Sequence, residues 1–302
     1  MDESGKIKIK AEFLLLFVSI NWGISFPIIK ILLQYCSPEA VVFYRFAITL
    51  LLFLILYPKI FTKVKFTDLK YGLILGGFVF GGFITQTIGL SITTSQKSAF
   101  ITGTYVVLLP FAQYLIIKKA PKKENIVGVI MVMIGLFFLT QIKEANFNIG
   151  DFLTLICAVF FTVHIVYLDK FLNEKKADYR ALVLGQFLVM TIAGFLSMTL
   201  VEVIITKTYF FEINTTSVFS ILYISVVCTL LGWLIINNYQ RYTTPVKAGI
   251  IYSMEVVFAV FSAYLIINES LELDQIMGAI LMLTGMAVSE FYGYIKKSKV
   301  TL

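Results

Sequence analysis

Glu255 is the residue of this sequence whose type and position most clearly indicate chemistry. It lies about ten residues into an apolar segment, and a helical rise of about 1.5 Å per residue places its carboxyl group near the midplane of a bilayer. A charge at that depth is costly unless it is paired or hydrated, so such a carboxyl group marks a functional site. We expect Glu255 to carry a proton or to bind an amine on a solute.

His164 is the only histidine, and it also lies inside an apolar segment. It can assist Glu255 in proton transfer, contact a ligand, or serve as a hydrogen-bonded packing residue. A membrane enzyme would need several convergent acid, base or metal-binding groups. One histidine, one mid-span glutamate and the scattered Cys36, Cys157 and Cys228 do not supply them. The sequence therefore predicts no enzyme activity, no metal site and no cofactor.

Polar and aromatic side chains inside other apolar segments form a second set of candidates. Aromatic walls with a few polar groups are typical of small-molecule pockets. This set fits a flat or amphipathic organic solute better than a bare ion. The residues expected to line the cavity together with Glu255 and His164 are Asn21, Trp22, Gln86, Tyr105, Trp233, Asn237 and Tyr252.

Four basic residues are candidates for gating or pairing: Lys30, Arg45, Lys97 and Lys247. Arg45 lies roughly two turns into an apolar segment, where an arginine costs at least ~2.5 kcal/mol unless it faces a partner or water. Lys30 lies near the end of a segment, from which its side chain can reach the interface. The alternative to a functional role is a side chain that reaches water at the interface for Lys30, and a structural pairing with a helix C-terminus or a loop carbonyl for Arg45.

The elements that must position these residues are apolar segments. Hydrophobic residues make up 59% of the 302 and charged residues 14%, against roughly 45–50% and about 25% in soluble domains. A helix needs about 20 apolar residues to cross the hydrocarbon core. The sequence predicts an all-α integral membrane protein with ten transmembrane helices, near residues 12–34, 39–57, 69–92, 97–117, 124–141, 149–168, 180–204, 216–238, 246–267 and 274–291.

One stretch occurs twice. Thr93–Gly135 aligns without a gap with Thr243–Gly285, 150 residues later, so that TTSQKSAFITGTYVVLLPFAQYLII lies over TTPVKAGIIYSMEVVFAVFSAYLII. Self-similarity at a fixed offset indicates an internal duplication. We expect a first five-helix repeat over residues 12–141, a second over 149–291, and cytoplasmic tails at 1–11 and 292–302.

Five helices per copy is an odd number, so the second copy must insert upside down relative to the first. Inverted repeats with a site near the midplane are the architecture of carriers that open alternately to the two sides. Lys97 and Lys247 begin corresponding helices, and Glu255 stands where Tyr105 stands in the first copy. We therefore expect Lys97 and Lys247 at the two mouths, with interface anchoring as the alternative.

The net charge of +7 reflects membrane topology rather than nucleic-acid binding. With a cytoplasmic N-terminus, most of the 25 Lys and Arg residues fall in connections on the cytoplasmic side. This asymmetry is the positive-inside pattern. It predicts a multi-pass plasma-membrane protein with both termini in the cytoplasm, and no nucleic-acid partner.

Several segments form a recognisable pattern: NWGISFPIIK, FYRF, SITTSQKSAFITGTY and PFAQYLII in the first copy, and RYTTPVKAGIIYSMEVVFAVFSAYLIINES and IMGAILMLTGM in the second. They resemble EamA-type transporters of the drug/metabolite transporter superfamily. The resemblance implies two inverted five-helix repeats and transport of small metabolites. The family commonly has Glu-Pro in the ninth span, whereas Glu255 precedes Val256 here, which leaves a kink at this point open. Glu269 matches the family's Gly-Glu helix end, with Asn268 in place of the glycine.

We expect a secondary transporter that exports small organic metabolites by alternating access. Its solutes are expected to be amino-acid-like, nucleobase-like or drug-like. The alternative is a lipid or polyprenyl-carrier flippase of related build. The sequence contains no ATP-binding motif, so gradients or exchange must drive transport. The expected partners are a small-molecule substrate and the lipid bilayer, with protons as the candidate coupling ion, and the chain is expected to be a monomer or a homodimer.

Overall fold

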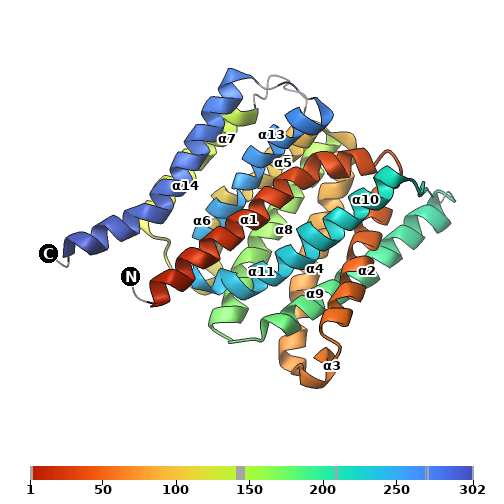
Figure 1. Ribbon diagram of the computed structural model, residues 1–302, viewed down its shortest axis with the longest axis horizontal. Helices are drawn as coiled ribbons and strands as arrows, with labels where there is room; N and C mark the ends of the chain where they lie inside the picture. Colours follow the sequence, from red (N-terminus) through yellow and green to blue (C-terminus); the bar gives the residue numbers. More distant parts are fainter. Residues whose placement is uncertain (1–2, 141–146, 208–209, 269, 271, 301–302) are drawn as a thin grey trace.

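The structure is a computed structural model that describes residues 3–140, 147–207, 210–268, 270 and 272–300. These residues are predominantly helical (Figure 1). The first half of the chain forms α1 (Glu3–Leu32), α2 (Pro38–Leu56), α3 (Ile60–Lys63), α4 (Phe66–Ile92), α5 (Ser95–Gly103), α6 (Tyr105–Ile117) and α7 (Lys123–Thr140). The second half forms α8 (Ile149–Asn173), α9 (Tyr179–Met198), η1 (Thr199–Ile205), α10 (Thr215–Tyr223), η2 (Ile224–Leu231), α11 (Gly232–Tyr239), η3 (Gln240–Tyr242), α12 (Pro245–Tyr252), α13 (Met254–Ile267) and α14 (Leu273–Val300).

The chain is a multi-pass membrane protein. Within the described residues, eight helical segments are long and apolar enough to cross a bilayer. α14 contributes a shorter apolar stretch, Leu273–Ser289. α5 and α6 together form one crossing, and so do α12 and α13. Counted in this way, the helices follow the predicted order and are compatible with ten spans. The spans are Lys6–Leu32, Pro38–Leu56, Phe66–Ile92, Ser95–Ile117, Ile149–Asn173, Tyr179–Ile205, Thr215–Tyr242 and Pro245–Ile267.

The duplicated helices begin and end at corresponding residues. The Thr94 and Thr244 side chains cap α5 and α12 by accepting hydrogen bonds from the backbone N–H groups of Lys97 and Lys247. At the other end, Lys118 and Asn268 both adopt the left-handed conformation at φ 54° that commonly terminates a helix. Equivalent sequence signals therefore produce equivalent elements. The predicted helix-end residue Glu269 and the last predicted residue of the first repeat, 141, lie outside the described residues.

The fourth helix of each copy is interrupted near its middle. α5 passes into α6 at Thr104, and α12 passes into α13 at Ser253. At both breaks a hydroxyl group donates to a carbonyl three residues earlier: Thr104 to Ile101 at 2.6 Å and Ser253 to Ile250 at 2.8 Å. Hydroxyl groups that bond back to the helix tend to bend it. In the ninth span the helix is therefore broken without the proline that the family pattern has after the glutamate.

The two copies are inverted relative to each other, as the contact between α7 and α14 demonstrates. A Cβ atom on Gly128 would lie 3.0 Å from the carbonyl oxygen of Gly285, and one on Gly135 would lie 2.7 Å from that of Gly278. Gly128 corresponds to Gly278 and Gly135 to Gly285, so the early residue of each helix meets the late residue of the other. This reciprocal pairing defines an antiparallel crossing about a pseudo-two-fold axis. Figure 1 shows the two helices side by side along one edge.

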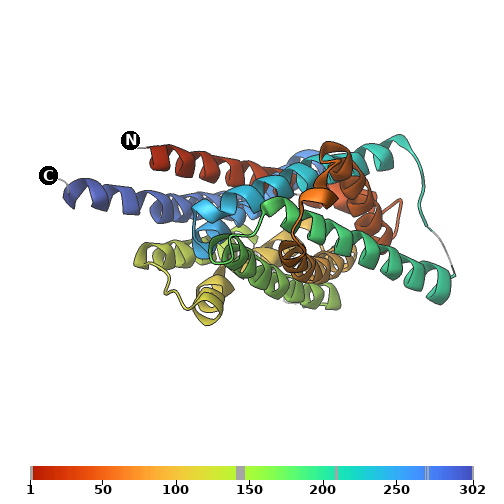
Figure 2. The same cartoon turned by 90° about the horizontal axis from the view of Figure 1, so that it is seen from below.

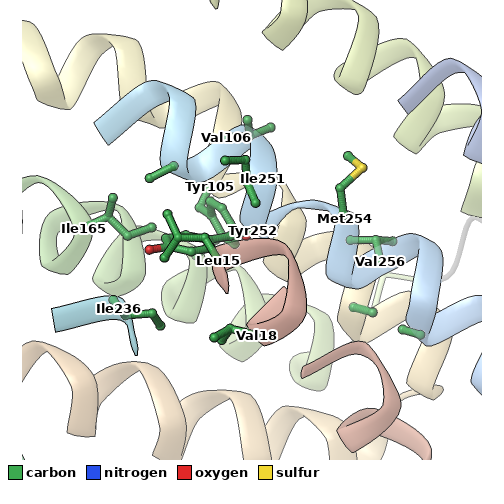
Figure 3. Packing of buried hydrophobic residues seen from close by; sticks show 14 of the residues in the cluster. Leu15, Val18, Tyr105, Val106, Ile165, Ile236, Ile251, Tyr252, Met254 and Val256 are labelled. Atoms are coloured by element: carbon green, nitrogen blue, oxygen red, sulfur yellow. The ribbon is translucent and has the colours of Figure 1, made fainter. Parts of the chain in front are cut away.

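The remaining helices interlock across the copies. α1 packs along α13 and α6 packs on α8, while α4 lies against both α8 and α9. The largest buried cluster draws on both copies, and Figure 3 shows Tyr105 and Tyr252 at its centre, with Leu15 of α1 and Ile165 of α8 nearby. Figures 1 and 2 place the beginning of α1 and the end of α14 at the same end of the molecule.

Candidate functional site

A cavity lies at the level of the two helix breaks, between the copies. The space between its side chains measures about 600 Å³, counting the part that is continuous with the outside. The lining residues are Trp22, Ser25, Phe26, Arg45, Phe83, Gln86, Tyr105, Phe161, His164, Ile165, Trp233, Ile236, Gln240, Tyr252 and Glu255.

The structure brings most of the candidate residues to this cavity, but not all of them. The candidates that line it are Trp22, Arg45, Gln86, Tyr105, His164, Trp233, Tyr252 and Glu255. Asn21 and Asn237 are not among the lining residues. Asn21 donates to the Phe17 carbonyl at 2.8 Å and accepts from the Tyr223 hydroxyl at 3.0 Å. Asn237 donates to the Trp233 carbonyl at 2.9 Å, so both amides are engaged within the packing between helices.

Glu255 lies in the first turn of α13, just after the helix break, and is only 4% exposed. Its carboxyl group lies close enough to the Tyr105 hydroxyl for the two to interact. That hydroxyl forms no well-aligned hydrogen bond with any residue in the described part of the chain. Tyr105 begins α6 and corresponds to Glu255 in the repeat, so the duplication places both groups at the equivalent breaks.

Arg45 extends from α2 into the cavity and is only 3% exposed. Its Nε donates to the Thr229 hydroxyl at 2.5 Å, and its guanidinium carbon lies 4.6 Å from the centre of the Phe83 ring. Contact with an aromatic face stabilises a buried cation. Among the described residues, no carboxylate forms an ion pair with Arg45.

Gln186 of α9 organises the polar wall around His164. Its Oε1 accepts from the Trp233 indole N–H at 2.9 Å and lies 2.9 Å from the His164 Nε2. Its Nε2 donates to the Asn237 side chain at 2.9 Å and to the Leu182 carbonyl. Because Oε1 can only accept, this arrangement places the imidazole hydrogen on Nε2. Gln186 thereby fixes the orientation of His164 and Trp233.

Trp22 and Trp233 form the aromatic wall of the cavity. Their ring centroids are 5.5 Å apart, and Trp22 lies 5.8 Å from the Tyr252 ring. The Trp22 indole N–H donates to the Cys228 carbonyl at 2.9 Å. Both indole N–H groups are therefore bound to protein atoms, which leaves the ring faces as apolar surface for a solute.

An ion pair lies beyond the cavity toward one end of the molecule. Lys97 at the start of α5 contacts Asp151 at the start of α8, with the Nζ and Oδ2 atoms 2.6 Å apart. The buried Asp151 also accepts from the Thr93 hydroxyl at 2.9 Å and from the Asn148 backbone at 2.8 Å. These bonds hold the carboxylate in place, so the pair joins the two copies firmly at this end.

A second ion pair lies toward the other end. Lys247 at the start of α12 contacts Glu12 of α1, with the Nζ and Oε1 atoms 2.8 Å apart. Glu12 also lies 3.7 Å from Lys8. Lys97 precedes Tyr105 by eight residues, and Lys247 precedes Glu255 by eight residues, or about 12 Å at 1.5 Å per residue. Because the copies are inverted, the two pairs flank the cavity on opposite sides, and both are closed in this conformation.

Lys30 lies outside the cavity. Its Nζ donates to the Leu90 carbonyl at 2.8 Å and to the Thr93 carbonyl at 2.7 Å, at the C-terminal end of α4. The last carbonyl groups of a helix lack partners within the helix, and a cation there is stabilised by the helix dipole. Lys30 is thus paired with the end of α4, a role that was considered from the sequence for Arg45 and not for Lys30.

The chain is similar to known transporters over most of its length. A family model described as the EamA-like transporter family matches residues 9–141 and 148–290. The chain belongs to this family. The two matched segments lie end to end along the chain, so this EamA-like transporter contains two family units.

The alignments with individual relatives cover nearly the whole transporter. An uncharacterized transporter of Archaeoglobus fulgidus is 34% identical over 284 residues, covering 94% of this chain and 87% of that protein. A probable amino-acid metabolite efflux pump of Salmonella typhimurium is 27% identical over 302 residues, covering 93% of this chain and 95% of that protein. One crystal structure, 11% identical, has a TM-score of 0.75 and covers 94% of this chain and 97% of that chain, a likeness of fold alone.

Sequence reasoning missed three groups of residues. Gln186 is not among the predicted site residues, although it fixes two lining side chains. Glu12 and Asp151 were not considered as partners of the lysines, and the repeat alignment does not reach either of them. The other lining residues outside the prediction are Ser25, Phe26, Phe83, Phe161, Ile165, Ile236 and Gln240.

Proposed function

We propose that this EamA-like transporter exports small organic metabolites across the plasma membrane by alternating access, with both termini in the cytoplasm. The observation that carries the proposal is a cavity with charged and aromatic walls, flanked on opposite sides by two ion pairs whose lysines correspond in the repeat. Amino-acid metabolites are the first solutes to test, because the Salmonella typhimurium relative is named as their probable efflux pump. That name also supports the direction of export.

In this mechanism the ion pairs are the gates. Separation of Lys97 from Asp151 opens the cavity to one side, and separation of Lys247 from Glu12 opens it to the other. Each pair links the fourth helix of one copy to the first helix of the other, so rocking one copy against the other separates one pair while it compresses the other. With both pairs formed, the solute is enclosed.

Glu255 is the proposed coupling residue. A carboxyl group in a largely apolar cavity is neutral when it holds a proton, and it becomes a binding group for a cation once the proton leaves. Uptake of a proton from outside and its release inside would then drive a solute in the opposite direction. His164, held by Gln186 on the same cavity wall, is placed to assist.

The test is transport into proteoliposomes of a panel of amino acids, nucleobases and organic cations, with and without an imposed pH gradient. We expect gradient-driven flux for the wild type and its loss in Glu255→Gln, whereas the matched variant Glu174→Gln, at an exposed position, keeps wild-type flux. Flux that ignores both the gradient and Glu255→Gln contradicts the coupling role. Absence of flux for every solute in the panel contradicts small-solute transport and favours the flippase alternative.

A further inference from the structure

Hydroxyl side chains follow one face of α5, from the end of the molecule that holds Asp151 to the cavity. Ser95, Ser98 and Thr102 succeed one another at spacings of three and four residues, and Tyr105 continues the series at the start of α6. Side chains at these spacings are neighbours on a helix, with about 5–6 Å between their Cβ atoms. All four residues are buried. This hydroxyl row spans about 15 Å at 1.5 Å per residue.

Three of the four hydroxyl groups are not satisfied by the protein. In the described part of the chain, the Ser95 and Ser98 hydroxyls have no hydrogen-bond partner, and the Tyr105 hydroxyl forms no well-aligned hydrogen bond. Buried hydroxyl groups elsewhere in the helices bond back to a carbonyl four residues earlier, as Thr87 does to Phe83 at 2.7 Å. Buried polar groups without a protein partner commonly hold internal water. The hydroxyl row therefore suits a chain of water molecules better than dry packing.

The inner end of the hydroxyl row reaches Glu255. A Cβ atom on Gly103 would lie 2.7 Å from a methyl group of Val256. These two residues directly follow Thr102 and Glu255, so α5 and α13 are in contact at this level. The Cys157 thiol interacts with both the Thr102 hydroxyl and the Glu255 carboxyl group. The hydroxyl row and the carboxyl group are thus close neighbours.

The outer end of the hydroxyl row lies at the membrane surface. Thr94, directly before Ser95, is exposed, and the fourth crossing begins at this point. With the N-terminus in the cytoplasm, as proposed, the fourth crossing starts on the outer side of the membrane. The Lys97–Asp151 ion pair lies at the same end. The hydroxyl row therefore connects the outer surface to Glu255 through the protein wall, even while this ion pair is formed.

The second copy offers no equivalent connection. The residues of α12 that correspond to the hydroxyl row, 150 positions later, begin with Pro245, Ala248 and Tyr252. Pro245 and Ala248 have no hydroxyl group, and the Tyr252 hydroxyl donates to Gln240 Oε1 at 3.0 Å. The two copies share the lysines of the ion pairs, but only the first copy carries hydroxyl groups between its lysine and the cavity.

We infer that the hydroxyl row, with internal water between its side chains, carries protons from the outer surface to Glu255 while the Lys97–Asp151 pair stays closed. Each hydroxyl group or water molecule accepts a proton from its outer neighbour and donates its own proton to its inner neighbour. One proton leaves the outer water, and the Glu255 carboxylate becomes a carboxylic acid. Such relays of polar groups are a known means of moving protons within membranes. The inference rests on the proposed coupling role of Glu255 and adds the route to it.

Protonation of Glu255 can be followed without transport in the purified protein. After a rapid jump to lower pH, time-resolved infrared difference spectroscopy records the carbonyl band of the carboxylic acid. The part of the band that is missing in Glu255→Gln belongs to this residue. The other titratable groups that face Glu255 or line the same cavity have no carboxyl group and do not contribute: Tyr105, Cys157, Arg45, His164 and Tyr252.

Ser98→Ala and Thr102→Val each remove one hydroxyl group from the middle of the row. We expect each variant to slow the protonation of Glu255 at least about tenfold, the factor that corresponds to one lost hydrogen bond in the path. Thr102→Ser returns a hydroxyl group to the same position and should restore the rate. Thr191→Val is the matched control, because the Thr191 hydroxyl is likewise buried without a partner but lies on α9, outside the row.

Wild-type rates in both Ser98→Ala and Thr102→Val overturn the inference, as does a Thr191→Val variant that is equally slow. A wild-type protein without a Glu255 band at any accessible pH overturns it as well. The Thr102 hydroxyl accepts from the Gln86 amide at 3.0 Å. Should Thr102→Val fail to fold, Ser98→Ala decides alone, because its hydroxyl has no such partner to lose.

The proton route and the coupling proposal fail separately. Slow protonation in the row variants, together with wild-type flux that ignores the pH gradient, supports the route and contradicts coupling through Glu255. Gradient-driven flux at the wild-type level in Ser98→Ala and Thr102→Val contradicts the route and leaves the coupling proposal intact.

Discussion

Tyr105 and Glu255 occupy the same position in the two copies, and yet only one of them can carry a charge in the middle of the membrane. The duplication thus supplies two equivalent helix breaks, and the difference at this one position makes the cavity asymmetric. Arg45 adds the second charge from a different helix. The chemistry of the site therefore depends on a few residues that differ between the copies, whereas the helices that position them are similar in both.

Gln186 should be the most sensitive neutral residue among those that support the cavity wall. Gln186→Leu removes the acceptor of the Trp233 N–H and the partner of His164 Nε2, and each buried polar group left unsatisfied costs about 1–3 kcal/mol. We predict a loss of about 2–4 kcal/mol in the free energy of unfolding, measured by denaturant unfolding in detergent. Gln34→Leu, at an exposed position, is the control. A loss no larger than that of the control would contradict this role for Gln186.

At the level of single residues, the sequence predicted which polar side chains lie inside apolar segments, where burial costs free energy. It did not predict the hydrogen-bond partner of each one. Glu255 was recognisable because no local partner lies near it in the sequence. Asn21 and Asn237 looked similar, but a short amide inside a helix can donate to the carbonyl four residues earlier, and both do so. Gln186 was passed over because its partners come from α8 and α11, which only the folded chain brings together.

At the level of elements, the helices were predictable because length, apolarity and capping residues act locally. The interruption of the fourth and ninth spans was harder to predict, because the usual proline is absent after Glu255. The signal was nevertheless in the sequence, since Thr104 and Ser253 each supply a hydroxyl that bonds back to its helix. Such hydroxyl groups also occur in unbroken helices, so the residue type alone does not identify a break.

The crossing of α7 and α14 gives a direct test of packing at this scale. In Gly135→Ala the new Cβ atom would lie 2.7 Å from the Gly278 carbonyl oxygen, a backbone atom, and overpacking of this kind typically costs about 1–3 kcal/mol. In the matched variant Gly77→Ala on α4, the new Cβ atom meets nothing within 4 Å. Gly77→Ala should be neutral or stabilising by up to about 1 kcal/mol, since alanine is the better helix former.

Thermal unfolding of the two alanine variants in the same detergent provides the measurement. We predict that Gly135→Ala unfolds below the wild type and that Gly77→Ala unfolds at or above it. A Gly135→Ala variant as stable as Gly77→Ala would mean that α7 and α14 do not approach as closely as the structure has them, and would remove the best geometric support for the inverted arrangement.

At the level of the whole molecule, inversion of the copies explains why two similar lysines lie at opposite ends. The repeat alignment predicted that separation. It did not predict the partners, because Asp151 lies 54 residues after Lys97 (151 − 97) and Glu12 lies 235 residues before Lys247, each in the opposite copy. The expectation that both termini share one side of the membrane agrees with the beginning of α1 and the end of α14 lying at the same end of the molecule.

The central claim is that the two ion pairs are gates that open in turn, and bridging each gate covalently tests it most directly. One variant carries Lys97→Cys with Asp151→Cys, and the other carries Lys247→Cys with Glu12→Cys. A short bifunctional thiol reagent closes either pair, while the native Cys36, Cys157 and Cys228 are buried. The variants without the reagent are the controls and must retain flux.

The decisive measurement is solute flux in proteoliposomes with one gate bridged at a time. We predict that either bridge alone stops flux, that solute binding persists from the side that is not bridged, and that reversal of the bridge restores transport. Flux that continues with one gate bridged would contradict alternating access through these pairs.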